Sequence, residues 1–179
     1  SDADREWLQG WFMERIFPVL TPLAVDPAHP FPFITNLSLC MVLKLVREED
    51  GGTMRALLPL PPQIDRFIRL PAQEGEPRIR FVQLEDVIQL SMRRLFPGFI
   101  PAEHGLFRLI RDTDVEFEEE AEDLVRSYET ALKRRRRGRP ILLSVTAATP
   151  ADMVDFVAEE MDADRGGVVV VDGLLGIAD

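Results

Sequence analysis

Apolar and polar residues alternate along the first half of the chain with the two-residue period of a β-strand. Between residues 37 and 46 every second position is leucine or methionine, and a turn-forming stretch at 48–52 separates this run from a second apolar run at 54–58. The two runs predict a β-hairpin. Residues 65–70 and 78–84 interleave charged with apolar residues, and they predict two more short strands.

Helical periodicity, with apolar residues three and four positions apart, occurs in four stretches of the chain. The helices expected from it cover residues 2–16, 85–96, 115–137 and 151–161. Asp2 or Asp4 is the expected cap of the first helix and Asp114 that of the third. Thr149 is the expected cap of the last helix, with Pro150 at its first position.

Short apolar runs between and after these helices predict strands that return to the sheet. They lie at residues 106–110, 141–146 and 168–171, and the last, a run of valines, indicates a buried strand. This order of elements predicts an α+β fold, a single domain over residues 1–179 with a mixed β-sheet and its helices largely on one face. Within it we expect an entry helix at residues 1–18 and, at 171–179, an apolar run toward a further part of the protein that this chain lacks.

The composition is typical of a folded, intracellular domain. Apolar residues make up 46% and charged residues 29% of the 179 residues, which excludes a disordered chain. No apolar run approaches the roughly 18–20 residues that cross a bilayer. Cys40 is the only cysteine, so an internal disulfide and a multi-cysteine zinc site are excluded, in keeping with the cytoplasm. The net charge of −10 disfavours nucleic acid as a partner.

The two histidines are the first candidates for chemistry, but their spacing forms no metal-binding motif. His29 lies in a proline-rich loop, where it is either a structural imidazole or a contact to a phosphate group or a neighbouring domain. His104 has less support for a function. Cys40 falls inside a predicted strand, which favours a buried thiol over a nucleophile. Without a glycine-rich phosphate loop or a nucleophile elbow, the sequence predicts no catalytic, cofactor-binding or metal-binding residue.

A run of arginines ends the long third helix, which begins with a dense group of acidic residues. The run consists of Arg134, Arg135, Arg136, Arg137 and Arg139. Acidic residues at the start and basic residues at the end complement the helix dipole, so a solvated helix is one interpretation. Guanidinium groups also bind phosphate bidentately, so contact with a polyanion or with a partner is the other interpretation.

The segment from Ile16 to Leu39, IFPVLTPLAVDPAHPFPFITNLSL, resembles a signature of the bacterial polyphosphate kinase family, the ATP-using type that builds long polyphosphate chains. Three further stretches agree with that family in order and spacing: residues 107–115, the arginine run, and residues 171–179. The resemblance covers nearly the whole chain. It implies that the chain is the middle, or head, domain of such an enzyme, with an α+β fold.

The resemblance also implies that the whole protein is a transferase that binds ATP and magnesium and passes phosphate to polyphosphate through a phosphohistidine. In that family the two catalytic histidines and the phosphate-binding arginines belong to later, phospholipase-D-like domains, so none is carried onto this chain. For the middle domain it implies dimerisation and a share in the wall of the tunnel for nucleotide and polyphosphate. The whole enzyme is then expected to be a cytoplasmic homo-oligomer, with peripheral membrane association.

On its own the chain is therefore expected to be an inactive support whose partners are the other domains of the same protein, with ATP and polyphosphate as ligands of the whole. Apolar side chains near its ends, Trp7, Trp11, Leu174 and Leu175, are candidates for burial against those domains. Two alternatives stay open. One is a polyanion-binding module that uses Arg134 to Arg139 and His29, and the other is an unrelated acidic module that docks onto a basic partner.

Overall fold

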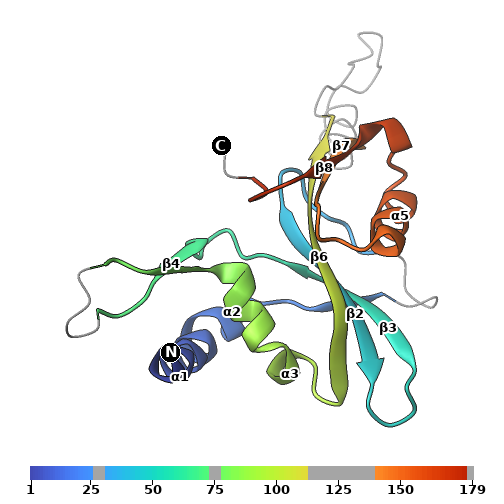
Figure 1. Cartoon of the computed structure of the whole chain (residues 1–179). Coiled ribbons are helices and arrows are strands. Elements are labelled where there is room, and N and C mark those ends of the chain that lie inside the picture. Colours follow the sequence, from blue (N-terminus) through green and yellow to red (C-terminus); the bar gives the residue numbers. More distant parts are fainter. Residues whose placement is uncertain (26–30, 73–77, 113–139, 177–179) are drawn as a thin grey trace, which may run out of the picture. The chain divides into compact units, whose positions relative to one another are not determined.

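The computed structural model describes residues 1–25, 31–72, 78–112 and 140–176 (Figure 1). The chain divides into two compact units, each made of two stretches: Ser1–Pro30 with Leu43–Glu103, and Phe31–Val42 with His104–Asp179. The long strands β2 (Leu39–Arg47) and β6 (Phe99–Arg111) each contribute residues to both units. Among the described helices, none has the length and apolar character needed to cross a bilayer.

A six-stranded sheet has the strand order β1-β3-β2-β6-β7-β8. Its remaining strands are β1 (Leu23–Val25), β3 (Thr53–Pro59), β7 (Pro140–Thr146) and β8 (Val168–Val171). β1 pairs antiparallel with β3 and β6 pairs antiparallel with β7, whereas β7 and β8 run parallel. This mixed sheet with its accompanying helices confirms the α+β fold that the sequence predicts.

The alternating run at 37–46 forms β2, and the turn after it leads into β3 as the predicted hairpin requires. Cys40, Met41, Val42 and Leu43 are all fully buried, so the centre of β2 is covered on both of its faces. The prediction is wrong at Leu37, which precedes the strand with a φ of 65°. Its backbone is left-handed, a conformation incompatible with continuing a β-strand.

The first helix is shorter than expected. α1 (Asp2–Trp11) is followed by a π-helical turn (Phe12–Ile16) and a 3-10 turn (Phe17–Val19). Neither expected aspartate is the cap, because Ser1 takes that position and its hydroxyl accepts a hydrogen bond from the Asp4 N–H at 3.3 Å. The Asp4 carboxylate reaches back to Ser1 and completes a capping box. The inner face of this segment is buried through Leu8, Phe12 and Ile16.

A two-stranded ribbon and two short helices complete the first unit. β4 (Phe67–Arg69) and β5 (Phe81–Gln83) pair antiparallel and confirm the two short strands that the sequence predicts. The helix expected at 85–96 is divided at Ser91, whose φ of −111° and ψ of 6° interrupt it, into α2 (Leu84–Leu90) and α3 (Met92–Leu95). Of the five residues that its spacing turns inward, Val87, Ile88, Met92 and Phe96 are buried, whereas Leu95 is only half-buried.

In the second unit α5 (Ala151–Glu160) confirms the last predicted helix, but Thr149 does not cap it. Pro150 takes the capping position with a ψ of 142°, and the Thr149 hydroxyl instead lies 2.9 Å from the hydroxyl of Thr146. A local side-chain hydrogen bond thus wins over the capping preference of threonine. β8 is also more open than predicted: it ends the strand order, and Val169 and Val170 are 45% and 62% exposed.

Candidate functional site

All six residues that the sequence singled out for ligand contact lie outside the described part of the chain. They are His29, Arg134, Arg135, Arg136, Arg137 and Arg139. His104 is described and lies exposed on β6. Cys40 is fully buried, which confirms the prediction of an inaccessible thiol. Among the residues that the structure describes, no three His, Cys, Asp or Glu side chains are grouped so that they could hold a metal ion.

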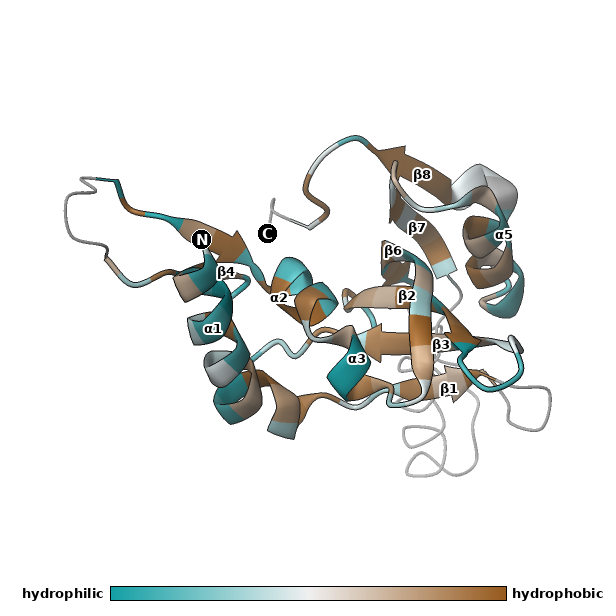
Figure 2. Cartoon of the chain, turned by 60° about the horizontal axis from the view of Figure 1, so that its bottom comes forward, coloured by the Kyte–Doolittle hydropathy of each residue, from teal (hydrophilic) through white to brown (hydrophobic). Residues whose placement is uncertain are grey.

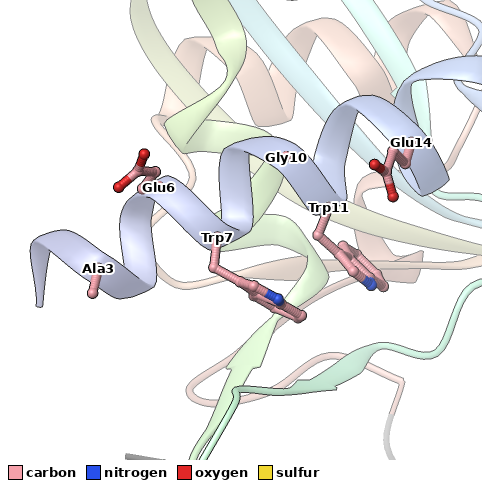
Figure 3. A pocket seen from close by; sticks show the side chains of 6 residues that line it. All are labelled: Ala3, Glu6, Trp7, Gly10, Trp11 and Glu14. Carbon is pink, nitrogen blue, oxygen red and sulfur yellow. The ribbon is translucent and has the colours of Figure 1, made fainter.

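A hollow lies along the outer face of α1 and the turn that follows it (Figure 3). Its lining residues are Ala3, Glu6, Trp7, Gly10, Trp11 and Glu14. The indole rings of Trp7 and Trp11 stack with their centroids 6.1 Å apart and their planes inclined by 24°. The structure thus brings together the two tryptophans that the sequence marked as apolar, and it adds two carboxylates that sequence reasoning missed.

The inner side of α1 is held by a bidentate ion pair. Arg80, which immediately precedes β5, donates from Nη1 and Nη2 to the two carboxylate oxygens of Asp4 at 2.6 and 3.0 Å. These hydrogen bonds, helped by the Ser1 hydroxyl, keep the pKa of the Asp4 carboxyl well below its ordinary value of 3.8. Because a fork of two charge-assisted bonds fixes direction as well as distance, the ribbon and α1 are held in a defined relation.

A second ion pair joins the ribbon to α2. Arg66 donates from Nε to Oε1 of Glu85 at 2.7 Å, and Glu85 is only 2% exposed. The carboxylate lies in the first turn of α2, where the positive end of the helix dipole also stabilises it. Sequence reasoning missed both pairs because their partners are 76 and 19 positions apart. The available signal was the regular spacing of arginines along the ribbon.

The same alternation gives the ribbon an outward apolar face. Successive side chains of a strand point to opposite sides. Because Arg66 and Arg80 point toward α2 and α1, the residues next to them in sequence face away from these helices. The outward apolar residues are Phe67, Ile79 and Phe81, which are 44%, 64% and 57% exposed. Figure 2 shows brown, hydrophobic stretches in this ribbon, beside the label β4. Exposed aromatic surface of this kind favours contact with another protein segment.

In the second unit the segment with the family resemblance ends in a loop that is clamped to β6. The guanidinium of Arg108 donates from Nε to the Leu37 carbonyl at 3.3 Å. Arg111 donates its backbone N–H to Oδ1 of Asn36 at 2.8 Å and its Nε to the Ile34 carbonyl at 3.1 Å. Partial burial lowers the pKa of the Arg111 guanidinium. Both arginines are therefore used to hold the loop in place.

Of the four apolar side chains near the ends of the chain that were expected to be exposed, three are at least partly exposed. Trp7 and Trp11 are half-buried, and Leu174 is 39% exposed. Leu175 contradicts the expectation, because it is 2% exposed and belongs to the core of its own unit. The chain thus keeps one of its two terminal leucines for its own packing.

Comparison with known proteins assigns these features to a family. Residues 3–179 match the family model described as the polyphosphate kinase middle domain. The chain is 43% identical over 180 residues to the polyphosphate kinase of Mycolicibacterium gilvum and 42% identical over 185 residues to that of Mycobacterium avium. In both cases 99% of this chain is covered, whereas it spans only 25% of the relative's length.

A solved structure supports the fold. The crystal structure of polyphosphate kinase from Porphyromonas gingivalis matches 96% of this chain and 24% of its own with a TM-score of 0.75, at 21% sequence identity. The α+β architecture therefore recurs within a much longer chain. Together with the sequence relatives, this confirms the resemblance that the segment from Ile16 to Leu39 indicated.

Proposed function

Because this chain belongs to the polyphosphate kinase family, whose middle domain it forms, we propose that the protein containing it transfers the terminal phosphate of ATP to a growing polyphosphate chain. The observation that carries the proposal is the 43% identity over 99% of the chain to a protein named polyphosphate kinase. The chain spans 25% of that relative, and the proposal assigns the groups that act on phosphate to the rest of the enzyme. ATP, magnesium and a phosphohistidine accordingly belong to the whole protein.

Within that enzyme the proposed role of this domain is support: it positions the catalytic domains, takes part in a subunit interface and forms a wall of the nucleotide and polyphosphate tunnel. This role is supported by the arginines of the domain that bind groups of the same chain. Arg66 and Arg80 are engaged by carboxylates, and Arg108 and Arg111 by backbone carbonyls. The apolar face of the ribbon and the tryptophan face of α1 are surfaces suited to contact with other protein segments.

The test of this division of labour compares the whole enzyme with residues 1–179. With ATP labelled in its γ-phosphate and magnesium, the whole enzyme should form labelled, acid-precipitable polyphosphate. Residues 1–179 alone should form none and should not acquire phosphate on His29 or His104. Failure of the whole enzyme to make polyphosphate would refute the activity, and labelling of a histidine in the isolated chain would refute the support role.

Direct binding of polyphosphate is the competing role, favoured by five arginines within the six positions 134–139. Calorimetry at low salt with long-chain polyphosphate separates the two roles. The paired substitution Arg135→Ala and Arg136→Ala should abolish any heat that arises from the run. The exposed pair Arg93 and Arg94 on α3 provides the matched control, because its replacement by alanine removes the same charge elsewhere. No heat with the unaltered chain would leave support as the sole role.

A further inference from the structure

α1 buries one side and presents a second, organised side on which Trp7 and Trp11 are only half-buried. The inner side carries Leu8 and the anchored Asp4. The outer side carries the hollow, in which the indole rings of Trp7 and Trp11 lie side by side on the same side of the helix (Figure 3). Tryptophan is the residue type most often responsible for binding energy at protein interfaces.

The spacing of the lining residues is that of a helix–helix seam. Ala3, Trp7, Gly10 and Glu14 follow one another at intervals of four, three and four residues, the repeat by which one helix packs along another. The tryptophans supply a large contact area. The small residues Ala3 and Gly10 leave space beside the tryptophans for the side chains of a second helix. A helical segment laid along α1 would fill the hollow.

Gly10 supplies an independent argument. A glycine inside a helix costs about 1 kcal/mol relative to alanine. Within 4 Å of a Cβ built at Gly10 there is no atom of the described residues, and its φ is outside the left-handed range, so neither crowding nor backbone conformation in this unit requires glycine. A missing side chain at an open position is what close approach of another backbone requires.

We propose that the outer face of α1 docks a basic, amphipathic helical segment of the same polyphosphate kinase chain, from outside residues 1–179. The inference rests on the proposed function in that this chain is taken as one part of a longer enzyme, as it spans 25% of the relative from Mycolicibacterium gilvum. The hollow carries the carboxylates of Glu6 and Glu14, and lysine or arginine beside them would form ion pairs and cation–π contacts with the indoles. A second copy of the face is disfavoured, because a two-fold interface would oppose the same carboxylates to one another.

The test measures how fast thiols on α1 react with a maleimide in the whole, folded enzyme. Gly10→Cys places a thiol in the hollow, and Ala3→Cys is a second probe that leaves the glycine in place. Gln9→Cys is the matched control, since Gln9 is exposed on the same helix and does not line the hollow. Each rate is divided by the rate of the same variant in urea, and the modified peptide is identified by mass spectrometry. The native Cys40 is fully buried and should not react.

We expect the thiols at positions 3 and 10 to react at least tenfold more slowly than the control thiol at position 9. Glu6→Lys combined with Glu14→Lys should restore rapid reaction, because it repels a basic segment. A photoreactive maleimide at position 10 should join α1 to a lysine- or arginine-containing peptide of the same chain.

Equal rates at positions 3, 9 and 10 would overturn the proposal. So would protection that survives the charge reversal, or a cross-link that joins two copies of the protein. None of these readouts depends on polyphosphate synthesis. A failed docking test therefore leaves the proposed activity standing, and an inactive enzyme leaves the docking test valid.

Discussion

Replacing Gly105 with alanine adds a single methyl group at the most crowded of the glycines that the structure describes. Gly105 is buried on β6, and a Cβ built there comes closer than 3.0 Å to three atoms of the Thr149 side chain. Real Cβ atoms essentially never show such separations. Thr149 is 9% exposed, and its hydroxyl lies 2.9 Å from that of Thr146, which also accepts the Leu106 N–H at 3.4 Å.

The magnitude follows from the two ways in which the crowding can be relieved. If the surrounding structure shifts, overpacking of this kind costs about 1–3 kcal/mol. If Thr149 rotates away, its hydrogen bond to Thr146 is lost at about 0.5–1.5 kcal/mol, with strain in addition. Gly105→Ala should therefore lower the free energy of unfolding by about 2 kcal/mol. Its φ does not lie in the left-handed range, so the loss is steric and not conformational.

Urea unfolding of residues 1–179, followed by far-UV circular dichroism, gives this free energy. Gly10→Ala is the matched control: it makes the same chemical change where a Cβ meets no described atom within 4 Å, and it should raise the free energy of unfolding by about 0.5–1 kcal/mol. Thr149→Ala removes two of the three crowding atoms, so the double variant should be more stable than the sum of the single effects by about 1 kcal/mol. A Gly105→Ala variant as stable as the unaltered chain, or strictly additive effects, would refute the steric argument.

The remaining predictions concern the two buried ion pairs and the ribbon. Asp4→Asn removes the bond to Arg80 and should destabilise the chain at pH 7. Because the folded state lowers the pKa of Asp4 from 3.8, its contribution is complete above that pH and is lost as the pH falls through the lowered value. The free energies of unfolding of the variant and the unaltered chain should therefore begin to converge below about pH 4 and become equal only in stronger acid. Glu85→Ala leaves Arg66 without its carboxylate and should lower the free energy of unfolding by about 3 kcal/mol in urea titrations. Phe81→Ser removes an exposed ring and should change that free energy by less than about 0.5 kcal/mol; a larger loss would show that the ribbon's outward face is part of this chain's own core.

The part of this fold that could be predicted from sequence is the part set by local periodicity. The alternation around Cys40 fixes a buried strand and its inert thiol, and the apolar spacing around Val87 fixes the inward face of α2. The contacts that orient these elements could not be predicted, because they join residues that are distant in sequence. Asp4 looked like a helix cap, and only the folded chain shows that it serves Arg80, 76 positions away.

β6 shows the second reason why prediction stopped short. Its apolar alternation begins only at residue 106, and the sequence therefore predicts a strand over 106–110, yet β6 starts at Phe99. Pro101, Glu103 and His104 carry no pattern of a half-buried strand, since a side chain that faces solvent is free to be polar or apolar. How far the exposed half of a strand extends depends on the strands with which it pairs. That pairing belongs to the tertiary structure and cannot be read from the local sequence.

The loop that carries the strongest family resemblance combines a strained backbone with an exposed apolar side chain. Leu37 holds a left-handed conformation with a φ of 65°, which costs a residue with a Cβ roughly 1–2 kcal/mol relative to glycine. The conformation is imposed because its N–H donates to Leu109 and its carbonyl accepts from Arg108. Its side chain is 52% exposed, so the core of this chain gains little from a leucine there. Leu37 therefore combines backbone strain that a glycine would remove with an apolar side chain that this chain leaves largely open.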